Sequence, residues 1–318
     1  MTPWAIEAAK LSTVSNFPTP GDVAQRVSSE IGLVTEGHAE GLRQFAFFPY
    51  RGPRPVPEET SLGPLAWGET LTSLADIAEH EDWTGASSTN QSLAILDSFL
   101  RYTHRRLVME DKISVTTDGE YAASNTGLLT PHAEEIFGFF QRNNHEGQSW
   151  FFVGWVTESD RQLLKHFDEP PQMAEYVTSA SGLVYDWRRD LKLAYDHILG
   201  DNIDRFPAAM TEQPLRARQA LDSAVNLTLR RVRRNHKLVV PQWYPKLGEA
   251  GAQFLMPLDL TGDGGADLAL VVSAVGDRAY RGHTVLTLDM AYTNARLVAR
   301  PDSDWLKPRA APRPHIDE

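Results

Sequence analysis

The chain has 318 residues, of which 42% are hydrophobic, and it contains no cysteine. The lack of cysteine excludes disulfides, Cys-ligated zinc, iron–sulfur clusters and thiol catalysis. The formal net charge of −11 argues against a surface that binds polyanions over its whole extent, but a local anion site remains open.

No apolar run approaches the roughly 20 residues that a membrane-spanning helix requires, and the N-terminus lacks the features of a secretory signal. We therefore expect a cytoplasmic protein with no membrane partner. Residues 1–39 are predicted to be an N-terminal segment with a short helix, which begins after the turn at Thr19-Pro20-Gly21-Asp22. We expect a single large domain over 40–306 and a disordered, proline-rich tail over 307–318.

Helical spacing dominates residues 70–145. Apolar residues recur three and four positions apart over 71–78 and 93–107, which predicts two helices. Alternating residues from Ile113 to Thr117 precede Asp118-Gly119, which favours a β-hairpin. After Thr130-Pro131 we predict a third helix, whose apolar face carries Ile136, Phe139 and Phe140.

The rest of the chain alternates between buried strands and helices before it becomes strand-like. We predict a strand over 150–156, a helix starting near Glu158, a short strand over 182–185, a helix over 187–200 and a long helix over 212–236. Four further strands are predicted at 238–244, 253–258, 267–275 and 284–298.

These elements predict an α+β fold. We expect an antiparallel or mixed sheet formed largely by the C-terminal third and packed by helices from residues 70–237. The strands at 113–124 and 150–156 are expected to join this sheet. Strands follow one another through turns in the last third, so a doubly wound sheet is not expected.

A basic stretch ends the long predicted helix. Between Arg230 and Lys237, five cations and His236 occur within eight residues of an otherwise acidic chain. Their combined field could hold an anion. The alternative is a solvated helix end, where cations interact favourably with the helix dipole.

A glycine-rich loop places Asp259, Asp263 and Asp267 at the first, fifth and ninth positions, as an oxygen-ligated calcium loop does. Thr261 and Leu270 stand where such loops usually carry Asp or Asn and Glu. We therefore favour a solvated hairpin between two strands and keep the calcium site as a weak candidate.

Several polar residues lie within apolar segments, where burial is costly without a partner. Glu110 and Lys112 flank a predicted helix-to-strand junction, and Asn125 lies next to Gly127. In the predicted strand 284–298, alternation places Tyr292, Asn294 and Arg296 on one face. That face is either the floor of a site or a solvated outer surface of the sheet, and both interpretations stay open.

Several segments together resemble the bacterial family known as domain of unknown function 3825. They are Phe45–Phe48, Leu107–Lys112, Asn125–Leu128, Trp150–Trp155, His197–Pro207, Asn235–Lys237 with Pro241–Tyr244, and Leu286–Leu297. The similarity covers roughly residues 40–306. Members of the family look like companions of RNA-binding modules such as cold-shock and OST-HTH domains. The resemblance implies a role near RNA or nucleotides and supplies no catalytic residues.

We first expect an enzyme that hydrolyses or transfers a phosphoester or pyrophosphate at an RNA end or on a nucleotide, with Glu110, Asp289 or His236 as acid or base. The expected substrate- and phosphate-binding residues are Lys112, Asn125, Arg205, Arg231, Arg234, Asn235, Lys237, Gln242, Tyr244, Tyr292, Asn294 and Arg296. The cofactor is unknown, and a divalent metal remains open. The alternatives are a noncatalytic RNA- or nucleotide-binding domain and a structural, partner-binding protein.

Overall fold

The fold was obtained as a computed structural model. The structure describes residues 40–53, 62–84, 93–145, 147–177, 180–244 and 253–306. These residues belong to one compact unit, Ala39–Glu318, and the other unit, Met1–His38, lies outside the described residues. The predicted N-terminal helix and the predicted tail over 307–318 therefore also lie outside them.

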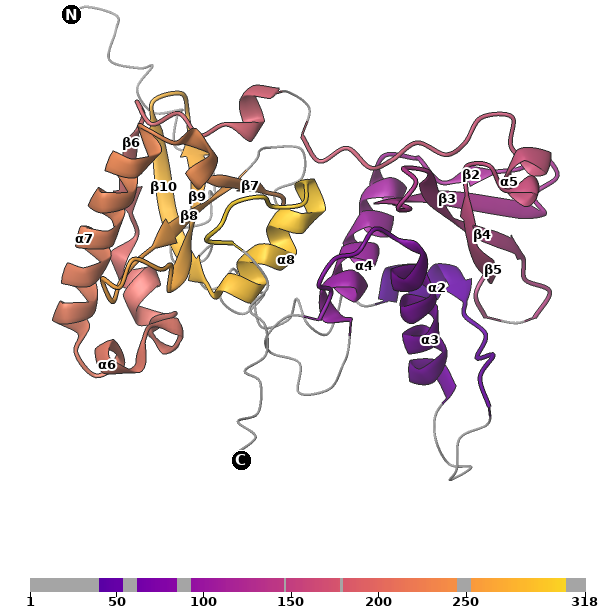
Figure 1. The fold of residues 1–318 in the computed structure, drawn as a ribbon, viewed down its shortest axis with the longest axis horizontal. Helices are drawn as coiled ribbons and strands as arrows, with labels where there is room; N and C mark the ends of the chain where they lie inside the picture. Colours follow the sequence, from indigo (N-terminus) through magenta and orange to yellow (C-terminus); the bar gives the residue numbers. More distant parts are fainter. Residues whose placement is uncertain are drawn as a thin grey trace, which may run out of the picture. The chain divides into compact units, whose positions relative to one another are not determined.

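The first sheet has five strands in the order β1-β5-β4-β3-β2 (Figure 1). Its strands are β1 (Ala46–Phe47), β2 (Ser114–Val115), β3 (Tyr121–Leu129), β4 (Glu135–Arg142) and β5 (Trp150–Thr157). Neighbouring strands are antiparallel except for β1 and β5, which run parallel. The predicted hairpin is confirmed, because β2 pairs with β3 across the turn that contains Gly119, whose φ of +72° favours glycine.

Helices cover both faces of the first sheet. They are α2 (Glu40–Phe45), α3 (Leu62–Ile77), α4 (Ala94–Met109) and α5 (Arg161–His166). Helices α3 and α4, both predicted from apolar spacing, share a buried core with Phe140 and Phe152 of the sheet. Leu163 of α5 shares a second core with Phe137 and Phe139 on the other face.

The second sheet also has five strands, in the order β6-β10-β9-β8-β7. They are β6 (Asp190–Leu193), β7 (Val240–Gln242), β8 (Gln253–Leu258), β9 (Leu268–Val275) and β10 (Ala279–Leu286). Only the pair of β6 and β10 is parallel. The predicted strands at 238–244, 253–258 and 267–275 are confirmed with small shifts at their ends.

The second sheet lies between two helices, with the short α6 (Ala208–Thr211) ahead of the first of them. On β9, Leu270 shares a core with Leu221 of α7 (Pro214–Val232), whereas Ala269 shares a core with Ala291 of α8 (Leu288–Val298). Successive strand residues point to opposite faces, so α7 and α8 cover opposite faces of the sheet (Figure 1).

The α+β class is confirmed, with a mixed sheet in the C-terminal region as predicted. The strands expected at 113–124 and 150–156 do not join that sheet. They form the separate first sheet instead. Sequence alternation shows that a strand is half-buried, but it does not show which sheet the strand enters.

Two predicted helices and one predicted strand are wrong. The helix expected after Thr130-Pro131 is β4, in which residues 136–140 are all buried because helices cover both faces of the sheet. Such a continuous apolar run resembles helical spacing. The helix expected over 187–200 is β6 followed by a π-helical turn, and the strand expected over 182–185 overlaps a 3-10 turn.

The predicted strand over 284–298 is also wrong after its first three residues. Strand β10 ends at Leu286, and Thr287 caps α8 by accepting a hydrogen bond from the backbone N–H of Met290. A Thr cap before an apolar stripe at helical spacing is the signal that was missed. As a result, Tyr292 and Arg296 lie one helical turn apart, whereas Asn294 points away from them.

Candidate functional site

A pocket with a volume of about 410 Å³ lies among α4, α8 and the 173–177 segment, and we call it the α4–α8 pocket. The polar and aromatic side chains that line it include Glu81, Trp83, Phe99, Tyr176, Arg296 and Arg300. Its remaining lining is mostly apolar and comes from β3, the 173–177 segment and the residues around the end of α8. Parts of the chain that are distant in sequence therefore build a single cavity.

A buried ion pair forms one wall of the pocket. The Nε atom of Arg296 lies 2.8 and 2.9 Å from the two carboxylate oxygens of Glu81, whose side chain is only 4% exposed. The hydroxyl of Tyr292 donates to the same carboxylate at 2.8 Å. Burial, followed by the charge of Glu81, raises the pKa of Tyr292, so its hydroxyl stays a donor.

Aromatic rings fix the orientation of the Arg296 guanidinium. Its central carbon lies 5.1 Å from the ring centroid of Trp83 and 4.7 Å from that of Phe99. Within the described residues, the hydrogen bonds found for Arg296 all use Nε. The rings and Glu81 thus hold the guanidinium in one orientation, and Arg296 lines the pocket.

A second arginine lies at the rim of the pocket. The side chain of Arg300 is 53% exposed, and its Nε is 3.9 Å from Glu81. Its Nη2 donates to the carbonyl oxygen of His80 at 3.3 Å. The pocket lining therefore contains two arginines and the carboxylates of Glu79 and Glu81, so its formal charge is balanced.

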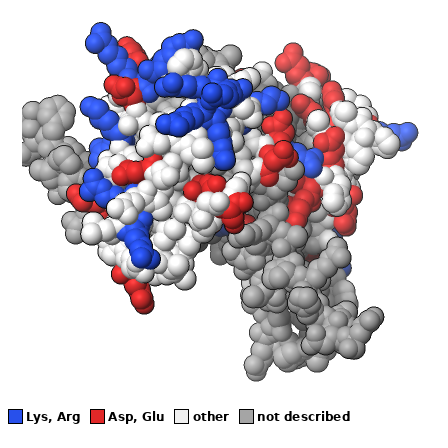
Figure 2. All heavy atoms as spheres, turned by 60° about the vertical axis from the view of Figure 1, so that its left-hand side comes forward, with Lys and Arg blue, Asp and Glu red and all other residues white. Residues whose placement is uncertain are grey.

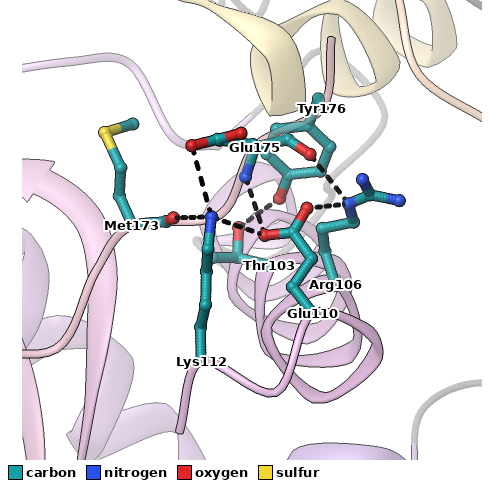
Figure 3. Close-up of polar contacts among 7 residues, drawn as sticks. All are labelled: Thr103, Arg106, Glu110, Lys112, Met173, Glu175 and Tyr176. Atoms are coloured by element: carbon teal, nitrogen blue, oxygen red, sulfur yellow. Dashed lines mark hydrogen bonds and ion pairs between the residues drawn. The ribbon is translucent and has the colours of Figure 1, made fainter. Parts of the chain in front are cut away.

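A cluster of ion pairs fastens the 173–177 segment to the end of α4 (Figure 3). The carboxylate of Glu110 accepts hydrogen bonds from Arg106 Nε, from Lys112 Nζ at 3.0 Å and from the backbone N–H of Glu175 at 3.0 Å. Lys112 also donates to the carbonyl of Met173 at 3.1 Å, and Arg106 to that of Glu175 at 2.8 Å. The cluster thereby positions one wall of the pocket.

Glu110 is ionised within this cluster. Burial alone would raise the pKa of its carboxyl, but the hydrogen bonds from the Glu175 backbone, Lys112 and Arg106 outweigh burial and lower it. A group with a lowered pKa is a poor proton donor near neutral pH. The geometry thus favours a positioning role for Glu110.

Tyr176 connects the 173–177 segment to α4 from inside the pocket. Its hydroxyl lies 2.9 Å from Thr103 Oγ1 (Figure 3). Its ring packs edge-on against Trp243, with 5.1 Å between the two ring centroids. Burial raises the pKa of Tyr176, so its hydroxyl stays protonated. The ring therefore offers the pocket a fixed, neutral surface.

The structure brings together two pairs of the residues predicted from sequence. Glu110 and Lys112 form an ion pair, and Tyr292 and Arg296 both bind Glu81. Of all the predicted site residues, Arg296 is the one found in the described lining of the α4–α8 pocket.

The other predicted residues lie elsewhere in the fold. Asn125 is buried and binds Glu135 at 3.0 Å and the carbonyl of Pro171 at 3.2 Å, and Arg205 donates to the carbonyl of Val285 at 2.5 Å. Asn294 and Asp289 lie on α8, and Tyr244 follows β7. These positions do not place them with Arg296 in the pocket.

The charged residues of the basic stretch are exposed, whereas Gln242, five residues beyond it, is buried. Arg231 and Arg234 lie at the end of α7, and His236 begins an exposed 3-10 turn. The side chain of Asn235 caps that turn by accepting from the backbone N–H of Lys237, whose Nζ lies 3.5 Å from Asp302. In contrast, Gln242 is buried and donates to Gln253 at 2.9 Å. Asn235, Lys237 and Gln242 were all expected to bind substrate, and none of them is in the described lining of the α4–α8 pocket.

The three carboxylates of the candidate calcium loop bind backbone of the same loop. Asp267 accepts from the N–H groups of Leu260 and Thr261, at 2.7 and 2.9 Å. Asp259 accepts from Gly262, and Asp263 from Gly265. Across the part of the chain that the structure describes, no group of three or more His, Asp or Glu side chains is placed to hold a metal.

Sequence reasoning missed Glu81, Trp83, Tyr176 and Arg300. Glu81 and Arg296 are separated by 215 residues, so no local spacing reveals their pairing. The only available signal was Trp83 among acidic residues, directly after the predicted helix over 71–78.

The model of one protein family, described as domain of unknown function (DUF3825), matches residues 74–305. The chain belongs to this family. The match spans Glu81, Glu110, the 173–177 segment and Arg296, so the DUF3825 domain includes every wall of the pocket. Comparisons with curated proteins and with solved structures found no match. Among the helices that the structure describes, none has the length and apolar character needed to cross a membrane.

Proposed function

We propose that the DUF3825 domain binds nucleotides, free or at the end of an RNA strand, with a phosphate group on Arg296 and Arg300. The observation that carries the proposal is the orientation of Arg296. Its Nε is occupied by Glu81, and its plane is held by Trp83 and Phe99. A guanidinium fixed in this way presents its two terminal nitrogens as a fork, which matches two phosphate oxygens.

Pre-orientation makes this arginine more effective than an exposed one. A flexible arginine loses side-chain entropy when it binds a ligand, whereas Arg296 is already held in one orientation and is only 11% exposed. Arg300 lies at the rim and adds a second, adaptable cation. Together they suit an anion that enters the pocket from solvent.

The size and lining of the pocket suit the rest of a nucleotide. A volume of about 410 Å³ lies within the range of roughly 300–1,000 Å³ that is typical of small-molecule sites. Leu128, Met173 and Val177 provide apolar walls, and the ring of Tyr176 provides a flat surface for a base. The lining thus supports a ligand that is part anion and part flat, weakly polar ring.

We propose binding and not catalysis, because the described side chains that line the pocket suit recognition of a ligand. Glu81 is engaged by Arg296 and Tyr292, and the predicted acid–base residues Glu110, Asp289 and His236 lie outside the described lining. Processing of an RNA end is tested separately. End-labelled RNA recovered intact after incubation, with and without Mg²⁺, supports binding alone, whereas a shortened or dephosphorylated product shows turnover.

Calorimetric titration with uridine and adenosine 5′-monophosphates tests the proposal. Arg296→Met should weaken binding at least about tenfold, because hydrogen bonds to charged groups contribute about 1.5–3 kcal/mol. Arg300→Gln, in an exposed side chain, should weaken binding several-fold and leave the fold unchanged. Arg161→Gln, an exposed arginine on α5, serves as the matched control. Wild-type affinity in both pocket variants would contradict the proposal.

A further inference from the structure

Arginines gather on the face of the molecule that carries α7. Figure 2 shows this concentration of blue side chains, which contrasts with the acidic composition of the whole chain. We call the exposed set at α7 the α7 basic face. It comprises Arg216, Arg218, Arg230, Arg231, Arg233 and Arg234.

Several arginines on this side are stacked on aromatic rings. Arg188 and Arg233 both lie over Trp187, with their central carbons 4.7 and 5.2 Å from its ring centroid. Arg218 lies 4.4 Å from the ring of Tyr195. A guanidinium lying on a ring keeps its donor edges available, because stacking uses only its flat face.

Two carboxylates close to these arginines are already engaged. Asp186 lies 3.6 Å from Arg188. Asp222 accepts a hydrogen bond from the hydroxyl of Tyr195 at 2.5 Å. Within the described stretches of the chain, no carboxylate ion-pairs with any arginine of the α7 basic face.

We propose that the α7 basic face binds the phosphate backbone of a nucleic-acid strand. A helix rises about 1.5 Å per residue, so Arg218 and Arg233 are separated by roughly 22 Å along α7. At about 3.4 Å per nucleotide of one strand, that distance corresponds to about six nucleotides. Contacts of this kind go to phosphates, so binding is independent of base sequence.

This inference does not rest on the α4–α8 pocket. Helices α7 and α8 cover opposite faces of the second sheet, so the basic face and Arg296 belong to different surfaces. A protein could bind mononucleotides and fail to bind strands, or the reverse. The two proposals therefore fail independently.

Fluorescence anisotropy with labelled 12-nucleotide oligouridine, at 50 to 300 mM NaCl, tests the inference. The logarithm of the affinity should fall with the logarithm of salt by about 0.7 for each phosphate contact. Combining Arg218→Gln, Arg231→Gln, Arg233→Gln and Arg234→Gln should flatten the slope by about 3 units and weaken binding at least tenfold at 50 mM salt. A four-nucleotide probe should bind more weakly than the 12-nucleotide probe, because it spans less of the face.

Three controls keep the result decisive. Arg161→Gln with Lys165→Gln, both exposed on α5, removes the same kind of charge elsewhere and should leave the slope unchanged. Circular dichroism shows that the fourfold variant is folded. Polyglutamate and vesicles that contain anionic lipid should bind wild type and the fourfold variant equally, because these arginines are not expected to bind them. Wild-type RNA affinity in the fourfold variant, or equal binding of polyglutamate or vesicles through these arginines, would overturn the inference.

Discussion

In the α4–α8 pocket, the side chain of Arg296 is 11% exposed and forms an ion pair with the buried Glu81. On the α7 basic face, in contrast, Arg231 and Arg234 are exposed. Within the described residues, neither of those two arginines ion-pairs with a carboxylate. If both proposals hold, the pocket arginine is expected to bind its ligand through its fixed geometry, and the α7 arginines through their summed charge. We expect salt to affect ligand binding weakly in the pocket and strongly on α7, because screening acts most on exposed charges.

The largest effect should come from the buried pair. Glu81→Ala leaves Arg296 without its partner in a desolvated site and should lower the free energy of unfolding by about 3–5 kcal/mol. Urea denaturation measures the loss. An effect below about 1 kcal/mol would show that solvent reaches Arg296 and that the pocket is not rigid.

A smaller effect is expected in the pH dependence of the free energy of unfolding, to which Glu110 contributes. Its pKa is lower in the folded protein than its ordinary value of 4.5, so its contribution to stability is present above pH 4.5 and is lost as the pH falls through the lower folded pKa. Glu110→Gln should flatten the stability profile in that acidic range. A profile unchanged by this substitution would show that the cluster with Arg106 and Lys112 does not stabilise the folded state.

Tyr176→Phe should have a modest effect. It removes one hydrogen bond to Thr103 and should cost about 1 kcal/mol of stability, with the ring surface of the pocket retained. Denaturation of Tyr176→Phe, Thr103→Val and the double variant measures the coupling. Additive effects would show that the two hydroxyls do not interact.

The smallest effect on stability should come from α7. Arg231→Gln replaces an exposed side chain and should change the free energy of unfolding by less than about 0.5 kcal/mol, yet reduce the salt slope of oligouridine binding by about 0.7. A large loss in the free energy of unfolding would show that Arg231 stabilises the folded state, as Arg296 is expected to, and would contradict the distinction drawn between the two arginines.

Local patterns predicted the elements whose sequence signal is local. The Asp118-Gly119 turn, the apolar stripe of α7 and the strands β8 and β9 each carry a signal within a few residues. The stretch after Leu286 was wrongly predicted as a strand, because helical and strand periods cannot be told apart over short apolar runs. The cap at Thr287, which marks the start of α8, was not recognised.

The pocket was largely beyond local prediction. Arg296 and Tyr292 were named from sequence, but their shared partner Glu81 lies more than 200 residues earlier. Glu110 and Lys112 were singled out as polar residues at a junction, and the structure pairs them as supports for the 173–177 segment. The sequence showed which polar residues would require hydrogen-bonding partners when buried, but only the tertiary structure shows which residues are those partners.

The most direct measurement compares the affinity for uridine 5′-monophosphate with that for uridine, in wild type and in Glu81→Gln/Arg296→Met. That double variant removes the guanidinium and the buried charge together, which limits the loss of stability. We predict that wild type prefers the phosphorylated ligand by at least about tenfold and that the variant loses this preference. An equal affinity for both ligands in wild type, or a preference that survives in the variant, would contradict phosphate recognition by Arg296.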